Sequence, residues 1–202
     1  MTIKALIWDM EGVLLHNRSG DLSTLIAERL DAPVDKTTEI FFSETNDLGD
    51  LGKISQDEFW NYVLDQLGKP HSMKPILERV FNEELYIDQD LLSVIREYRK
   101  TYKTGLITNY SSDMREKLKG TWAMGDTFDE VIISCEVGMV KPDPGIYRLM
   151  LEKLEVSADE AVFIDDRPKN IAGAAAFGIQ TILFINKEQA LADLDDILQA
   201  NV

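Results

Sequence analysis

Side chains able to bind a cation or a phosphoryl group follow four short apolar segments of the sequence. They are carboxylates, a hydroxyl, an amide and one amine, namely Asp9, Glu11, Thr108, Asn109, Lys141, Asp165 and Asp166. If the apolar segments are parallel strands, their carboxyl ends meet at one edge of a sheet, where open α/β sheets bind ligands. The spacing therefore predicts one site built from four distant parts of the chain.

The chemistry available to such a site is phosphoryl transfer assisted by a cation. Several carboxylate oxygens suit a hard cation, and a small number of fixed protein ligands favours Mg²⁺. A carboxylate held by that cation can attack phosphorus and form an aspartyl-phosphate. A second acid can protonate the leaving oxygen and later deprotonate water. A hydroxyl, backbone amides and a lysine would hold the phosphoryl oxygens and their charge.

The charge balance of the chain limits its partners. It has 36 acidic and 21 basic residues and a formal net charge of −15. We therefore expect no nucleic-acid partner. Any anion site must be made locally positive, and Lys141 supplies a charge beside a predicted helix start at Asp143 and Pro144. Ser111 or Ser112 is expected to cap a further helix, after the second apolar segment.

Five apolar segments rich in β-branched residues predict the strands of the sheet. They are IKALIW (3–8), KTGLIT (103–108), EVIIS (130–134), AVFID (161–165) and IQTILFI (179–185). Their residues are continuously apolar rather than alternating, as in parallel strands that are covered on both faces. From residue 88 onward they alternate with helix-like segments. This alternation predicts βαβ units and a three-layer, Rossmann-like α/β fold.

The pattern changes between the first two predicted strands. Residues 16–86 contain no convincing strand, and helices are predicted at 21–31, 35–47, 55–68 and 72–85, with turn chemistry at 47–55. Ser55 followed by Glu58 is a capping box. Because this block is long for a loop, we expect a helical cap inserted over the edge of the sheet. The predicted division is an α/β core of residues 1–15 and 87–202 and a cap of residues 16–86.

Four stretches of the chain resemble, in order and at family spacing, the motifs of the haloacid dehalogenase (HAD) superfamily. They are WDMEGVL (8–14), LITNY (106–110), VGMVKPDPGIY (137–147) and VFIDDRPKNIAGAAAFGIQTILF (162–184). GKISQDEFW (52–60) within the helical block is similar to the subgroup with a small α-helical cap, related to the phosphatase domain of soluble epoxide hydrolase and to sugar-phosphate phosphatases. The resemblance implies a Mg²⁺-dependent phosphatase of a small phosphorylated metabolite.

The resemblance assigns the carboxylates to metal binding and catalysis. Asp9 would be the nucleophile and a metal ligand, and Asp166 with Asp165 would hold Mg²⁺. Glu11 stands where most phosphatases of the superfamily have the acid/base Asp, and there the backbone carbonyl also contacts the metal. The longer side chain of Glu11 leaves open how well the acid/base group is placed.

The resemblance assigns the remaining motif residues to the phosphoryl group. Thr108 and Asn109 would contact it, and Lys141 would neutralise both the nucleophile and the phosphoryl charge. Arg167 is expected either to reach the substrate or to pair with a carboxylate of the cap. Asn170 is expected to cap or brace its own helix rather than to touch a ligand.

Two other enzyme activities and one non-enzymatic function are alternatives to a phosphatase. A dehalogenase would use Asp9 to displace halide without a metal, and the Asp165–Asp166 pair argues against it. A phosphomutase would need an acid/base group that favours a sugar hydroxyl over water, and the sequence does not decide this. A degenerate domain that only binds a ligand or partner is the alternative that Glu11 raises. The other motif positions, which are intact, argue against that alternative.

The remaining features concern compartment and packing. A single cysteine, Cys135, fits a reducing compartment, and it is expected to serve packing. The N-terminal apolar run is too short for a signal peptide, and no segment is long enough to span a membrane, so we expect a cytoplasmic monomer or dimer without membrane contact. Trp8 is expected in the core, and His16 is expected to be structural.

Overall fold

The centre of the molecule is a five-stranded parallel sheet. The computed structural model describes residues 2–111 and 114–200. The strands lie in the order β5-β4-β1-β6-β7, and every neighbouring pair is parallel. They are β1 (Ala5–Trp8), β4 (Lys103–Thr108), β5 (Glu130–Ile133), β6 (Ala161–Asp165) and β7 (Gln180–Leu183). Each lies within a segment predicted as a strand, so the predicted parallel sheet is confirmed.

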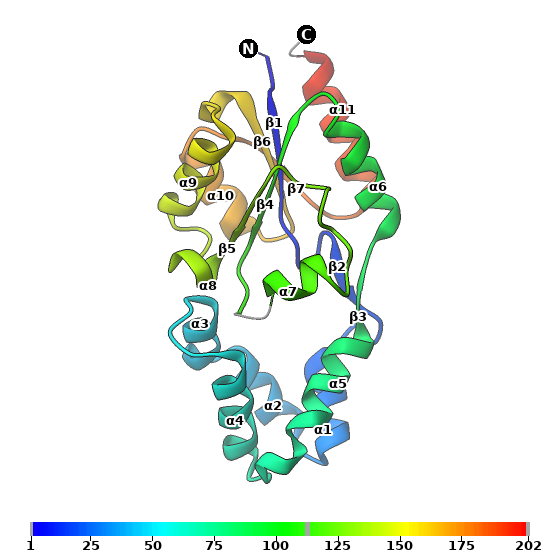
Figure 1. The fold of residues 1–202 in the computed structure, drawn as a ribbon, viewed down its shortest axis with the longest axis vertical. Coiled ribbons are helices and arrows are strands. Elements are labelled where there is room, and N and C mark those ends of the chain that lie inside the picture. The colour runs from blue at the N-terminus through cyan, green and yellow to red at the C-terminus, as the bar shows by residue number, and fades with distance from the viewer. Residues whose placement is uncertain (1, 112–113, 201–202) are drawn as a thin grey trace.

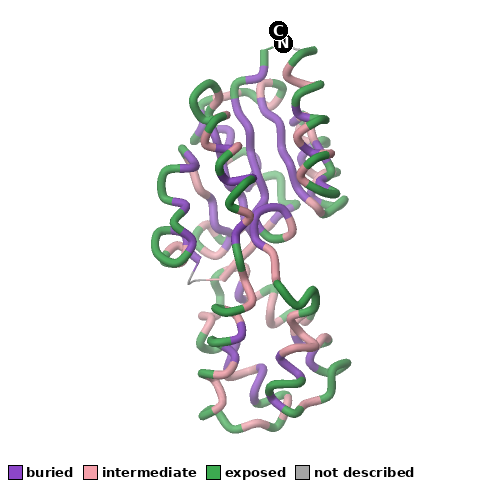
Figure 2. The backbone as a smooth tube through the Cα atoms, turned by 90° about the vertical axis from the view of Figure 1, so that its right-hand side faces the viewer, coloured by how far each residue is buried: buried purple, intermediate pink, exposed green. Residues whose placement is uncertain are grey.

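The side chains of β1 show that the sheet is covered on both faces. Leu6 and Trp8 belong to one buried cluster, and Ala5 and Ile7 belong to another. The helices that complete these clusters are α6 (Gln89–Tyr98) and α11 (Lys187–Ala200) on the first face and α9 (Pro144–Leu154) and α10 (Pro168–Ala176) on the second. Figure 1 shows the two helix pairs on opposite sides of the sheet, and Figure 2 shows the buried strands between them. The predicted three-layer fold is confirmed.

Five α-helices between residues 22 and 84 form a separate layer, which we call the helical insert. They are α1 (Leu22–Leu30), α2 (Val34–Phe41), α3 (Glu44–Asp50), α4 (Gln56–Leu67) and α5 (Lys74–Glu84), with a 3-10 turn at His71–Met73. The insert lies beyond the carboxyl ends of the strands, in the lower half of Figure 1. It has its own buried cluster, which includes Trp60, Leu64 and Leu77. The capping box of Ser55 and Glu58 is present at the start of α4.

A two-stranded antiparallel sheet joins the insert to the α/β layers. Its strands are β2 (Leu15–Asn17) and β3 (Leu85–Ile87), with His16 opposite Tyr86. The expectation that residues 16–86 contain no strand is therefore wrong at both ends of that range. Strands of three residues carry no local periodicity, and pairing between distant parts of the chain stabilises them. The predicted domain boundaries fall within these two strands and stay a prediction.

Two further boundaries differ from the sequence-based expectation. The helix predicted over 35–47 is divided into α2 and α3 at Phe42 and Ser43, and α3 continues to Asp50 within the predicted turn. The remaining short elements are α7 (Met114–Lys119), α8 (Ser134–Val137) and a 3-10 turn at Ala158–Glu160. Of the two serines expected to cap α7, Ser112 lies outside the described residues. Within residues 2–111 and 114–200, no helix has both the length and the apolar character needed to cross a membrane.

Candidate active site

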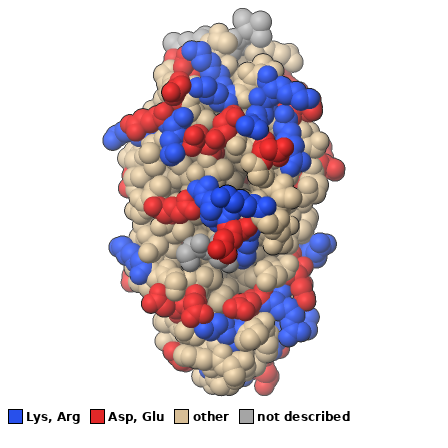
Figure 3. Space-filling view, viewed as in Figure 1, with Lys and Arg blue, Asp and Glu red and all other residues tan. Residues whose placement is uncertain are grey.

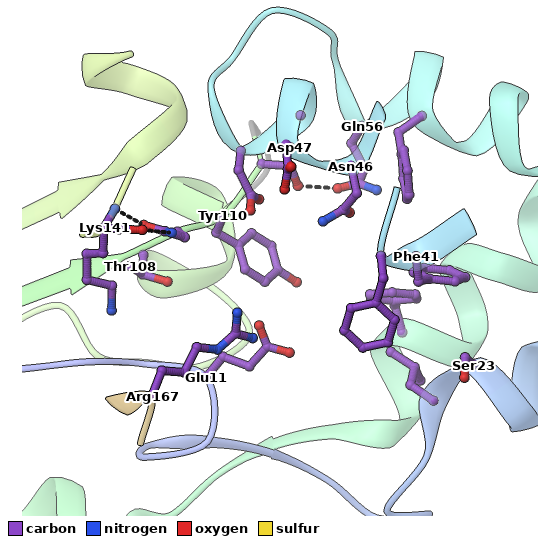
Figure 4. A pocket seen from close by; sticks show the side chains of 18 of the residues that line it. Glu11, Ser23, Phe41, Asn46, Asp47, Gln56, Thr108, Tyr110, Lys141 and Arg167 are labelled. Atoms are coloured by element: carbon purple, nitrogen blue, oxygen red, sulfur yellow. Dashed lines mark hydrogen bonds between the residues drawn. The ribbon is translucent and has the colours of Figure 1, made fainter. Parts of the chain in front are cut away.

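A cavity of about 540 Å³ lies between the carboxyl ends of the strands and the helical insert. Its walls include Asp9 after β1, Thr108 at the end of β4, and Lys141. Figure 4 shows Lys141 and Thr108 at one end of the cavity, with Glu11 and Arg167 toward the middle. The strand ends of the sheet therefore converge as the spacing of the sequence predicts.

Three carboxylates lie close together beside this cavity, and one of them, Asp9, lines it. Asp9, Asp165 and Asp166 each offer an oxygen, and these atoms all lie within 4.8 Å of one another. Gly12 has φ +84°, and a Cβ at this position would overlap the carboxylate of Asp166. The glycine of the first motif is therefore needed for two reasons, since its backbone is left-handed and its missing side chain makes room for Asp166.

Lys141 is buried, with 2% of its surface exposed, and its ammonium group lies between two of these carboxylates. Its Nζ forms ion pairs with Oδ1 of Asp9 and, at 2.7 Å, with Oδ2 of Asp165. Asn109 donates from Nδ2 to the Lys141 carbonyl at 3.1 Å and accepts from its backbone N–H at 2.8 Å. Asn109 therefore braces the lysine through its side chain, and the predicted contact of Asn109 with the phosphoryl group stays a prediction.

Burial raises the pKa of Asp9 to about 7, because water is excluded from its carboxylate. The ammonium of Lys141 opposes this shift, and the negative charge of Asp165 adds to it. One lysine thus faces a group of three carboxylates in a largely buried position. A divalent cation would compensate this excess of negative charge.

Three buried oxygens in the cavity region lack a hydrogen-bond partner among the residues that the structure describes. They are Oγ1 of Thr108, Oδ1 of Asp166 and Oδ1 of Asn170. Buried polar atoms are normally satisfied, so unpartnered oxygens at a ligand-binding edge indicate groups that a ligand would complete. The oxygen of Asp166 fits a cation and the hydroxyl of Thr108 fits a phosphoryl oxygen.

Asp165 differs from Asp166 because protein donors already surround it. Besides Lys141, Nδ2 of Asn170 donates to both of its oxygens at 3.0 Å, and the backbone N–H of Arg167 donates at 2.8 Å. Asn170 thus braces the Asp165 carboxylate as well as its own helix, and the expectation that it touches no ligand stays a prediction. Asp165 ends β6 and Asn170 lies in the first turn of α10, so the short connection between strand and helix brings them together.

Glu11 lies apart from the group of three carboxylates. Its side chain lines the cavity on the side of Arg167 and retains contact with solvent (Figure 4). Surrounding protein and the charge of Asp166 raise the pKa of Glu11, against the opposing charges of Arg167 and Lys141. Among the described residues, the carboxylate of Glu11 is therefore not in the candidate metal group, and the predicted contact of its backbone carbonyl with a metal stays a prediction.

Other residues singled out in the sequence have structural positions. Trp8 is fully buried, as expected. His16 lies in β2 and away from the cavity walls, and its Nε2 donates to the Val13 carbonyl at 3.1 Å. Cys135 packs at the edge of a buried cluster. Asp143 caps α9 by accepting from the Gly145 N–H at 2.7 Å, which confirms the predicted helix start behind Lys141.

The insert adds a carboxylate that sequence reasoning did not identify. Asp50, at the end of α3, lines the cavity opposite the strand ends, and its carbonyl accepts from Oγ of Ser134 at 2.6 Å. Burial, together with the negative charges of Glu11 and Asp47, raises the pKa of the Asp50 carboxyl to about 7. Its position depends on how the insert rests on the sheet, and the sequence around it resembles an ordinary polar turn.

We expect Asp50→Asn to stabilise the metal-free protein at pH 8 by about 1 to 2 kcal/mol relative to wild type. The folded pKa of Asp50, about 7, is above its unfolded value of about 3.9, so the folded state binds more protons between these values. Stability from this group is present at low pH and is lost as pH rises through 7. Denaturant unfolding at pH 5 and pH 8 measures the effect, with Asp159→Asn as the exposed control. An equal gain at both pH values would contradict the prediction.

The fold and the carboxylate edge together define a three-layer, Rossmann-like α/β core with a candidate cation site. The chain belongs to the haloacid dehalogenase-like hydrolase family, whose model matches residues 3–178. This match covers the sheet strands β1 to β6, the helical insert and α10.

Several known proteins are similar to this chain. The bifunctional epoxide hydrolase 2 of Sus scrofa is 26% identical over 98% of this chain and 39% of that protein, so the chain spans about two fifths of its length. A sesquiterpene phosphatase of Aspergillus oryzae is 29% identical over 88% of both chains. A HAD family enzyme of Bacteroides thetaiotaomicron, crystallised with magnesium and inorganic phosphate, has a TM-score of 0.74 and 25% identity, covering 89% of this chain and 93% of that chain.

Proposed function

We propose that the protein is a Mg²⁺-dependent phosphatase that hydrolyses a small phosphate monoester through an aspartyl-phosphate on Asp9. The observation that carries this proposal is the arrangement of Asp9, Asp165 and Asp166 within 4.8 Å, with the ammonium of Lys141 between the first two. The similarity to a sesquiterpene phosphatase and to an enzyme crystallised with magnesium and phosphate supports it.

The first half of the reaction forms the covalent intermediate. A carboxylate oxygen of Asp9 attacks phosphorus, and the bond from phosphorus to the leaving oxygen breaks. Glu11 gives its proton to the leaving oxygen, which departs as an alcohol. Lys141 holds the charge of the phosphoryl oxygens, and the unpartnered hydroxyl of Thr108 donates to one of them.

The second half returns the enzyme to its starting state. Glu11, now ionised, takes a proton from water as the water oxygen attacks phosphorus. The bond from phosphorus to Asp9 breaks, which releases inorganic phosphate and the free carboxylate. Asp9, Asp165 and Asp166 would hold Mg²⁺, which supplies Lewis-acid stabilisation of the phosphoryl oxygens when it is bound. Asp166 has the oxygen best placed for this, because donors of the protein already occupy Asp165.

The helical insert acts in this proposal as a cap over the site. Its α3 contacts the core at Ser134 through the Asp50 carbonyl, and Gly52 (φ +69°) approaches the carbonyl of Cys135 so closely that a Cβ would overlap it. Oγ of Ser111 also bonds to Oε1 of Gln56 from the insert. Closure of these contacts would exclude water during phosphoryl transfer, and opening would admit the water that hydrolyses the intermediate.

We expect removal of divalent metal to abolish hydrolysis and to lower thermal stability. With p-nitrophenyl phosphate, EDTA should reduce the rate at least about 100-fold, since Mg²⁺ compensates the carboxylate charge. Mg²⁺ at about 100 times its Kd should raise the Tm by about 5 to 10 °C. Asp166→Asn should lose most of this increase, whereas the exposed control Asp159→Asn should retain it. Appreciable turnover in EDTA would overturn the phosphatase proposal.

A dehalogenase would turn over its substrate without a metal. Release of chloride from 2-chloropropionate in EDTA therefore distinguishes a dehalogenase from a phosphatase. Two observations disfavour that activity. Asp166 retains an unpartnered buried oxygen beside Asp9 and Asp165, and a metal-free displacement of halide has no use for it. Glu11 also lines the cavity as a second carboxylic acid, whereas departure of halide requires no proton.

A further inference from the structure

The cavity has two chemically different ends. At the core end lie Lys141 and Thr108, and at the other end Phe41 projects from the insert (Figure 4). The apolar side chains that line the insert end are Leu22, Phe41, Phe42, Phe59, Trp60 and Phe81. They come from four different helices and the residue that follows α2, so only the folded insert brings them together.

The aromatic rings of this wall support one another. The ring centroid of Phe41 lies 5.7 Å from that of Phe59, 6.2 Å from Trp60 and 6.2 Å from Phe81. Trp60 and Phe81 are in edge contact at 4.7 Å. Offset and edge contacts of this kind hold aromatic rings in fixed positions. The wall is therefore preformed for contact with an apolar group.

Phe42 is the most exposed large apolar side chain among the described residues, with 81% of its surface accessible. It lines the same cavity as the buried ring system. An exposed aromatic side chain at the edge of a site is covered when a ligand binds, and this contributes to binding by removing apolar surface from water. Phe42 therefore extends the wall toward the cavity mouth.

The charged residues between the two ends disfavour an additional anion. Apart from Asp9 and Lys141, the lining has the acids Glu11, Asp21, Asp47 and Asp50 and the bases Arg167 and Lys169. With Glu11 protonated as the general acid, the three remaining acids still outnumber the two bases, and the formal charge of the whole chain is −15. A leaving group with a carboxylate or a further phosphate would meet this repulsion. An uncharged group would not.

The space along the wall suits an elongated group. The first cavity, of about 540 Å³, extends from Asp9 and Lys141 to the rings of the insert. A second cavity, of about 310 Å³, lies beside Lys117 of α7 and shares Gln56, Trp60 and Phe81 with the first as a common wall. Sites of this size bind ligands well beyond the dimensions of a phosphate group.

We propose that the leaving group of the substrate is a bulky, uncharged, apolar alcohol that binds against the aromatic wall. This inference rests on the proposed phosphatase function, and it names the class of monoester that the site hydrolyses. Phe41 and Phe42 determine the specificity for the apolar chain, because they line the insert end of the cavity whose other end contains Lys141 and Thr108. Sugar phosphates and nucleotides are poor substrates, since they present hydroxyls or further charge to the rings.

The test compares n-alkyl phosphates from ethyl to octyl in kcat/KM with Mg²⁺, alongside glucose 6-phosphate and AMP. We expect kcat/KM to rise about two- to fourfold for each added methylene while the chain remains on the wall. Binding of the matching n-alkylphosphonates, which cannot be hydrolysed, is measured by calorimetry on the same protein. Their Kd should fall in parallel, with a negative heat-capacity change that grows with chain length.

Phe42→Ser isolates the contribution of the wall, because the side chain is exposed and its loss leaves the buried cluster of the insert intact. The ratio of octyl to ethyl phosphate in kcat/KM should fall about tenfold in this variant. Val34→Ser, at the other end of α2 and outside both cavities, is the matched control, and its ratio should equal that of wild type. A ratio that falls equally in both variants would overturn the role of Phe42.

The outcomes separate this inference from the phosphatase proposal. Hydrolysis of ethyl and p-nitrophenyl phosphate with a flat or falling dependence on chain length would overturn the apolar leaving group and leave the phosphatase standing. Faster turnover of glucose 6-phosphate or AMP than of octyl phosphate would do the same. An absence of all turnover would overturn the phosphatase, whereas phosphonate binding that tightens with length would still support an apolar pocket.

Discussion

The variant Asp9→Asn is expected to lower kcat for p-nitrophenyl phosphate by at least about 10⁴-fold, because the amide cannot form the acyl-phosphate bond. The substitution preserves shape at a buried position, and it removes a carboxylate whose pKa is raised to about 7 by burial. The folded state should therefore persist, as thermal unfolding would show. The rate is measured at saturating Mg²⁺, so that weaker metal binding does not cause the loss.

Two variants of Glu11 serve as the comparison. Glu11→Gln should retain the aspartyl-phosphate step but lose the acid/base group, with a fall in kcat of about 10²- to 10⁴-fold. Glu11→Asp restores the side chain found in most phosphatases of the family, and a large gain in rate would show that Glu11 is poorly placed. If wild type is no faster than Asp9→Asn, the protein is a binding module and the phosphatase proposal fails.

Replacement of Lys141 by Met should have the largest effect on folding stability, about 3 to 5 kcal/mol of destabilisation without metal. The ammonium is 2% exposed and pairs with Asp9 and Asp165, so its removal leaves two buried carboxylates without their cation. The loss should be larger at pH 8 than at pH 5, because protonation relieves the unpaired carboxylates at low pH. Urea unfolding at both pH values measures it.

Lys153→Met is the matched control for Lys141→Met. Lys153 pairs with Glu130 at 3.1 Å on the surface, and 43% of its side chain is exposed. Surface pairs contribute about 0 to 1 kcal/mol, so this variant should unfold close to wild type. Equal destabilisation by the two substitutions would contradict the central position of Lys141. Added Mg²⁺ should restore part of the stability of Lys141→Met, because it supplies positive charge to the same carboxylates.

The face of the molecule shown in Figure 3 carries charges of both signs. Figure 3 shows lysine and arginine side chains interspersed with aspartate and glutamate over the face in view. The ion pairs Lys74–Asp57 and Arg99–Asp129 are examples, at 2.6 and 2.9 Å. On this face the two signs of charge are interspersed, whereas the carboxylates Asp9, Asp165 and Asp166 lie together at the end of the sheet that faces the insert.

The sequence predicted the parallel sheet because fully buried strands must be apolar on both faces. Ala5 and Ile7 pack on one side of β1, and Leu6 and Trp8 pack on the other. Such a strand appears in the sequence as a continuous apolar segment. It also placed Asp9, Lys141 and Asp166 at strand ends, since parallel strands bring their carboxyl ends together. By contrast, β2 and β3 were missed because three-residue strands depend on a partner far along the chain.

For the site, the sequence by itself determined which functional groups are present. The tertiary structure decided which of them have protein partners and which are left for a ligand. Asp165 and Asp166 are adjacent carboxylates with the same chemistry, yet Asn170 and Lys141 surround the first while the second keeps an unpartnered oxygen. The aromatic wall around Phe41 and the carboxyl of Asp50 were also invisible in the sequence, because helices of the insert contribute them. Such features depend on distances between segments that local patterns do not encode, whereas strand ends and helix caps follow from local chemistry.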